Sequence, residues 1–91
     1  MKILVICRPR EGVDPRTEVA PRAADEMTAL RRLRDDGVLL EAYSPGGPGA
    51  ILIFEGARDE IERALQTLPL VRARVISTEL IELHPFAALG E

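Results

Sequence analysis

Residues 38–55 read VLLEAYSPGGPGAILIFE, and this stretch is the starting point for predicting the fold. Apolar and β-branched residues fill both of its ends, at 38–43 and 50–55, which is typical of strands. Between them, the cluster SPGGPG at 44–49 excludes a helix and favours a turn. Two strands joined by a short loop of glycine and proline predict an antiparallel hairpin in the middle of the chain.

The segment before the hairpin predicts one strand and one helix. Met1–Cys7 is a short apolar run that is rich in β-branched residues, as in a strand covered on both sides. Asp14 is a good helix cap with Pro15 at the first helical position. Beyond Pro21, apolar residues recur every three or four positions until Gly37, which suits the end of an amphipathic helix.

The segment after the hairpin repeats this order. We expect Asp59 to cap a second amphipathic helix that ends at Pro69. Residues 72–83 then predict a last strand, which Pro85 closes. Strand, helix, two strands, helix and strand together make the ferredoxin-like βαββαβ pattern of the α+β class.

This pattern predicts one domain over residues 1–91, with two helices on one face of a four-stranded antiparallel sheet. The other face also carries apolar side chains, because Ile51 and Ile53 alternate with Leu52 and Phe54. A chain of 91 residues is marginally stable alone, so something must cover that second face. We therefore predict a homodimer or a higher homo-oligomer, in which two sheets pack into a dimeric α/β barrel.

Composition excludes several classes of function. A net charge of −3 and an aromatic content of 3% argue against nucleic acid as a partner. One cysteine and one histidine cannot form an internal disulfide or a metal cluster, so we expect no metal. The apolar runs fall short of the roughly 20 residues that span a bilayer, and no signal peptide is visible. We expect a cytoplasmic protein with no membrane partner.

Two residues stand out as candidates for acid–base chemistry. Glu26 borders the apolar stripe of the first helix, where a partly buried carboxylate would have a raised pKa and could move a proton. The alternative is a glutamate at the helix edge, paired with a nearby arginine. His84 follows the last strand and could act as a general acid or base, or be a surface histidine.

Glu41 and Tyr43 are further candidates because they alternate along one strand with Leu39. If their shared face lines a pocket, Glu41 could act as a base and Tyr43 could donate a hydrogen bond to a carbonyl. If that face meets solvent, both are ordinary surface residues. Cys7 is better interpreted as a small buried hydrophobe than as a nucleophile.

Three stretches resemble the muconolactone isomerase family. They are ADE at 24–26 with its helix running to Gly37, FE at 54–55 with the second helix leading into LPL at 68–70, and HP at 84–85. The resemblance implies dimeric α/β barrels with a hydrophobic pocket. It also implies a proton shift within an unsaturated lactone, without a metal or an organic cofactor. By this resemblance, Glu26 and His84 correspond to functional residues of the family.

The sequence departs from that family in the strand at 38–43. The family is rich in tryptophan, arginine and histidine there, whereas this chain reads VLLEAY and offers no cation in that strand for a substrate carboxylate, so Arg8 or Arg72 would have to substitute. We therefore expect a more apolar pocket, whose ligand is a small, largely apolar oxygenated molecule.

The leading hypothesis is a cofactor-independent isomerase. Glu26 or Glu41 would be its base, and His84 or Tyr43 would polarise or reprotonate the substrate. One alternative is a cofactor-free monooxygenase or cyclase of the same barrel superfamily, acting on a polyketide or aromatic compound. Another is a non-catalytic protein that binds a small molecule or serves in assembly.

Overall fold

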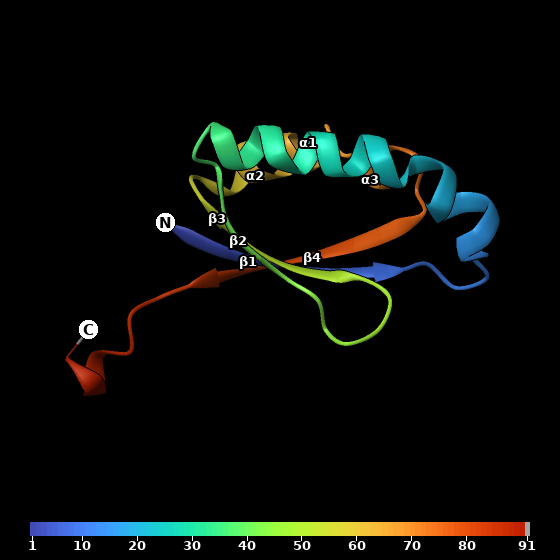
Figure 1. Cartoon of the computed structure of the whole chain (residues 1–91). Coiled ribbons are helices and arrows are strands. Elements are labelled where there is room, and N and C mark those ends of the chain that lie inside the picture. The colour runs from blue at the N-terminus through green and yellow to red at the C-terminus, as the bar shows by residue number, and fades with distance from the viewer. Residues whose placement is uncertain (91) are drawn as a thin grey trace.

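The computed structural model describes residues 1–90, which are built around a four-stranded antiparallel sheet (Figure 1). Its strands lie in the order β2-β3-β1-β4, with every neighbouring pair antiparallel, so the predicted ferredoxin-like fold is confirmed. The main elements are β1 (Lys2–Pro9), α1 (Ala23–Asp35), β2 (Leu39–Tyr43), β3 (Ala50–Glu55), α2 (Arg58–Leu65) and β4 (Ile76–Leu83). The shorter elements are η1 (Pro15–Val19), η2 (Ala20–Arg22), α3 (Pro69–Arg72) and η3 (Ala87–Leu89).

The helices α1, α2 and α3 lie on one side of the sheet, as Figure 1 shows. The core forms between them and the sheet. Along the central strand β1, Ile3 and Val5 are fully buried under the helices, while Leu4 and Ile6 point to the other side and are half-buried. Phe54 of β3 and Ile61 of α2 complete the centre of this core.

Two glycines allow tight turns of the chain, one before the hairpin and one within it. Gly37 follows α1 with a φ of 77°, the left-handed conformation that the sequence predicts for a residue just past a helix. Gly49 precedes β3 with a φ of 110°, and a Cβ atom there would clash with the carbonyl oxygen of Cys7. Glycine therefore allows the hairpin loop to approach the end of β1 closely.

The second half of the chain corrects two predicted boundaries. The cap position of α2 is Ala57, and Asp59 lies within the first turn instead. Pro69 does not end α2, which stops at Leu65, but begins the short helix α3. A proline suits this position because the first residues of a helix have no N–H bond to lose. The last strand consequently begins at Ile76 rather than at residue 72.

The strand β2 corrects a third prediction, that Leu39, Glu41 and Tyr43 share a face. Leu39 pairs with Phe54, yet Glu41 pairs with the adjacent residue Ile53, so the register shifts between them. Such a bulge inserts one extra residue and reverses which side the following residues face. Leu39 is buried under the helices, whereas Glu41 and Tyr43 lie on the opposite side of the sheet.

The side of the sheet away from the helices, here called the open face, carries apolar residues together with charged ones such as Arg8, Glu41 and Glu79. The strand register assigns to it Leu4, Ile6, Tyr43, Ile51, Ile53, Ile81 and Leu83. Nothing in residues 1–90 covers this face, and Tyr43 is 55% exposed. The predicted two-sided apolar sheet is therefore present.

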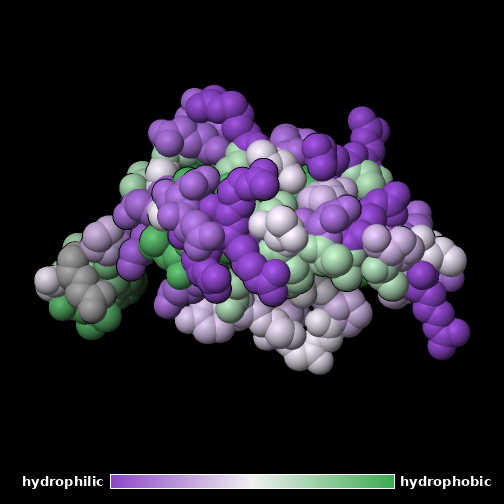
Figure 2. Space-filling view, turned by 45° about the horizontal axis from the view of Figure 1, so that its top comes forward, coloured by the Kyte–Doolittle hydropathy of each residue, from purple (hydrophilic) through white to green (hydrophobic). Residues whose placement is uncertain are grey.

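The surface over the helices differs from the C-terminal end of the chain. Figure 2 shows the helical side as largely hydrophilic, with hydrophobic residues gathered at the C-terminal end. Phe86 and Leu89 are strongly exposed there, on a segment that stands away from the sheet (Figure 1). Across residues 1–90, no helix has the length and apolar character needed to cross a membrane.

Candidate active site

An apolar cavity of about 440 Å³ lies at one end of the sheet, beneath the start of α1. Its floor comes from strand ends that include Cys7 of β1 and Leu52 of β3, and its roof includes Leu30 of α1. Pro15 and Pro48 bring in the segment η1 and the hairpin loop from the two sides. Leu70 of α3 and Ile76 of β4 also line this space, here called the Glu26 cavity after its only carboxylate among the described lining residues.

Glu26 is the charged residue of this cavity, and its side chain is only 8% exposed. Its Oε1 atom accepts a hydrogen bond of 3.0 Å from the backbone N–H of Leu70. Burial raises the pKa of this carboxyl above its usual value, and the bond from Leu70 opposes part of that rise. Within residues 1–90 no arginine pairs with it, so the alternative of a glutamate at the helix edge does not hold.

The second carboxyl oxygen of Glu26 is the atom that can meet a ligand. Oε1 is engaged by Leu70, while Oε2 has no hydrogen-bond partner among residues 1–90. No buried side-chain oxygen in that range is both sealed from solvent and unpartnered, so Oε2 keeps at least some accessible surface. An accessible carboxyl oxygen in an apolar cavity can accept or deliver a proton.

Cys7 lines the same cavity but is chemically quiet. Its side chain is 3% exposed, and burial raises the pKa of the thiol to about 11, with a smaller contribution from the negative charge of Glu26. A thiol with that pKa carries its proton at neutral pH and is a poor nucleophile. This supports the interpretation of Cys7 as a small buried hydrophobe.

Glu41 and Tyr43 lie together, but away from the Glu26 cavity. The Tyr43 hydroxyl donates a hydrogen bond of 3.1 Å to Oε1 of Glu41, and this bond raises the pKa of Tyr43. Both side chains are exposed on the open face, and neither lines the cavity. Within one chain they cannot assist Glu26.

His84 lies at the other end of the sheet. Thr78 pairs with Cys7 at the cavity end, and His84 is six residues further along, or roughly 20 Å at the rise of an extended strand. The imidazole is 66% exposed, with its Nε2 atom 3.6 Å from Oε2 of Glu82. Within a single chain, His84 is therefore too far from Glu26 to act with it.

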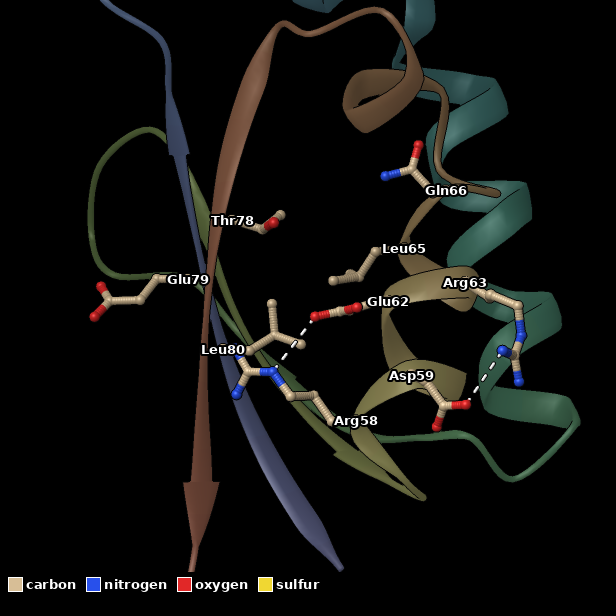
Figure 3. Close-up of a pocket in the computed structure, with 9 residues that line it drawn as sticks. All are labelled: Arg58, Asp59, Glu62, Arg63, Leu65, Gln66, Thr78, Glu79 and Leu80. Carbon is tan, nitrogen blue, oxygen red and sulfur yellow. Dashed lines mark hydrogen bonds and ion pairs between the residues drawn. The ribbon is translucent and has the colours of Figure 1, made fainter.

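A second hollow, between α2 and β4, has a different character (Figure 3). It measures about 750 Å³ and is lined mainly by exposed charged residues of α2. These are compensated along the helix, because Arg58 pairs with Glu62 and Arg63 pairs with Asp59. Figure 3 also shows Glu79 pointing to the far side of β4. This hollow is an ordinary solvated surface.

No group of three or more potential ligand residues that could hold a metal ion occurs within residues 1–90. The chemistry of the Glu26 cavity agrees with this, because its walls offer one carboxylate and one protonated thiol. Protein sites for transition metals need three or four convergent ligands.

Comparison with known proteins supports the fold. No family model and no curated protein matches this chain. In structure, it is similar to 5-chloro-2-hydroxyhydroquinone dehydrochlorinase from Burkholderia phenoliruptrix AC1100, solved as a complex with 2,5-dihydroxybenzoquinone. The TM-score is 0.73 at 17% sequence identity, and the match covers 97% of this chain and 98% of the other. The chain thus shares its ferredoxin-like fold with this dehydrochlorinase.

Sequence reasoning located Glu26 but missed most of the residues around it. Leu70 stands 44 positions further along the chain, and only α3 turns its N–H toward the carboxylate. Pro15 and Pro48 were expected only as parts of a helix start and a turn, yet both are walls of the cavity. No local pattern signals such a role, because each residue meets the cavity through tertiary packing.

Proposed function

We propose that this protein is a cofactor-independent enzyme of the muconolactone isomerase-like type, which shifts a proton within a small, largely apolar lactone or carbonyl compound. The observation that carries this proposal is the buried carboxyl of Glu26, with one accessible oxygen in an apolar cavity.

Glu26 serves as the general base of the proposed reaction. A base works best when its pKa lies near the working pH, and burial moves the pKa of Glu26 upward in that direction. Oε2 removes a proton from the carbon next to a carbonyl and returns it at another carbon, which relocates the double bond. The bond from Leu70 to Oε1 holds the carboxyl in place during both steps.

The size and walls of the cavity suit a compound of one or two rings. A volume of about 440 Å³ lies within the range of small-molecule sites, and the walls are mainly apolar. The structural neighbour from Burkholderia was solved with a small oxygenated ring, 2,5-dihydroxybenzoquinone. A ligand of this general class is proposed here as well.

We further propose that a second copy of the chain covers the open face. A sheet face that exposes several large apolar residues and is left bare by its own helices is typical of an interaction surface. Packing of two such sheets would enclose Glu41 and Tyr43 between the copies. In this arrangement Glu41, Tyr43 and His84 could contribute to catalysis only across the dimer.

Proton exchange tests the proposed reaction directly. Unsaturated lactones, cyclohexenones and hydroxylated ring ketones are incubated with the protein in D₂O, and deuterium incorporation is followed by NMR. We expect Glu26→Gln to lower the exchange rate by about 10²- to 10⁴-fold, as for loss of a general base. The glutamine keeps an acceptor for the N–H of Leu70, so the fold should persist.

Asp25→Asn is the matched control, because Asp25 is the exposed neighbour of Glu26 on α1. Equal exchange by the wild type and both variants would exclude Glu26 as the base. Oxygen consumption during turnover would instead favour a monooxygenase, and ligand binding without exchange or turnover would favour a binding protein.

A further inference from the structure

The walls of the Glu26 cavity carry negative charge but no positive charge. Among the described residues that line it, Glu26 is the carboxylate and Cys7 is the other titratable group. The remaining lining residues are apolar, proline or glycine, with no lysine, arginine or histidine within residues 1–90. The carboxyl group of Glu26 is therefore the one strongly polar side chain that these walls offer to a ligand.

Arg10, Arg16 and Arg31 are next to lining residues in the sequence but do not line the cavity, and three further arginines near it make contacts elsewhere. Arg8 stands between two lining residues, but it points to the open face and pairs with Glu79 at 3.1 Å. Arg22, one turn before Glu26, donates a bond of 2.6 Å to the backbone carbonyl of Glu18. Arg72, just after Leu70, borders a separate polar hollow on the helical side.

We infer that the Glu26 cavity selects neutral ring compounds that bear a hydroxyl group beside the carbonyl or as its enol, such as hydroxylated ring ketones and quinols, and rejects ring compounds bearing a carboxylate. This inference names the substrate class of the proposed enzyme and so rests on the proposed function. It also separates this protein from an enzyme for a lactone that carries a carboxylate, for which a cation would be needed in the site.

The physical reason is the different cost of burying the two groups. A carboxylate entering the cavity would lose its hydration without gaining a cation, and it would meet the negative charge of Glu26. A hydroxyl loses much less hydration and regains a hydrogen bond at Oε2 of Glu26. It can donate to the ionised carboxylate or accept from the protonated acid, so it fits both states of Glu26.

Two probes that share the same methyl-substituted ring test this selectivity: 4-methylphenol and 4-methylbenzoate. Their binding to the full-length protein at pH 7 is measured by NMR titration, which needs no turnover. We expect 4-methylphenol to bind at least about tenfold more tightly, because only the benzoate must bury an uncompensated charge. Equal affinities, tighter binding of the benzoate, or no detectable binding of the phenol would each overturn the inference.

Two variants sharpen the test by changing the charge of the cavity. Val19→Lys adds a cation at the half-buried wall formed by η1, and it should tighten binding of 4-methylbenzoate by about tenfold. Thr28→Lys is the control, since Thr28 is exposed on α1 and lies outside the cavity. Equal effects of the two lysines would mean that the benzoate responds to overall charge only, which contradicts the inference.

The outcomes separate this inference from the proposed function. Selective binding of the phenol without any proton exchange on ketone substrates would refute the enzyme and retain the ligand class. Exchange that depends on Glu26 but shows no preference against carboxylates would retain the enzyme and refute the ligand class.

Discussion

The two faces of the sheet are built from the same strands, yet they differ in almost every physical property. On β1, Ile3 and Val5 face the helices and are fully buried, whereas Leu4 and Ile6 face outward and are half-buried. Both pairs are equally apolar in sequence. The comparison teaches that alternation decides which residues share a face, while the elements packed on that face decide how deeply they are buried.

The contrast extends from packing to chemistry. Glu26 lies on the covered side, where burial raises the pKa of its carboxyl and leaves one oxygen facing an apolar cavity. Glu41 lies on the open face, where it is exposed and hydrogen-bonded to Tyr43. Two glutamates that were comparable as candidates in the sequence therefore differ in what they can do in one chain.

The largest expected effect comes from removing a buried side chain on the face of the sheet that the helices cover. Phe54→Ala should lower the free energy of unfolding by about 3–5 kcal/mol, because Phe54 is fully buried and its removal leaves a cavity. Ile53→Ala, at the adjacent position on the open face, should cost the monomer much less, since Ile53 is only half-buried. Urea denaturation at low protein concentration measures both, and equal losses would contradict the contrast between the faces.

A second change tests whether another copy covers the open face. Ile53→Lys should weaken self-association by at least about tenfold, because a lysine would be buried between two apolar sheets. Sedimentation equilibrium over a range of concentrations measures the dissociation constant. Gln66→Lys provides the control on the exposed helical side. A wild-type protein that stays monomeric at high concentration would refute the proposed dimer.

The smallest effect concerns pH and the one carboxylate of the cavity. The pKa of Glu26 is raised in the folded protein, so its ionisation opposes folding as the pH rises above the usual value of 4.5. Relative to Glu26→Gln, the wild type should lose stability from about that pH upward. The loss is complete above the raised pKa, and in acid the difference no longer changes with pH. Thermal unfolding of both proteins across this pH range measures the difference in stability. A difference that does not change with pH would contradict a raised pKa for Glu26.

Local signals in the sequence predicted the elements well. The hairpin at 38–55, the helix ending at Gly37 and the two-sided apolar sheet all depend on residues close together in the chain. The predictions that were wrong involve choices between similar local options. Ala57 rather than Asp59 caps α2, and Pro69 begins a helix instead of ending one.

The candidate site could be predicted only in part. The position of Glu26 beside an apolar stripe indicated a partly buried carboxylate, and the structure has one. The bulge in β2 could not be predicted, because it depends on how the strand pairs with β3. That one extra residue moves Glu41 and Tyr43 to the face opposite Leu39.

Residue patterns along the chain left Glu26 open between a partly buried carboxylate and a glutamate at the helix edge, but they established the order of the elements and the fold class. These follow from periodicity and turn chemistry, which act over a few residues. Only the tertiary structure decided that Glu26 shares an apolar cavity with Cys7 and Leu70, and that His84 lies at the far end of the sheet. The reason is physical: a cavity forms where distant segments pack, and no short stretch of chain encodes which segments will meet.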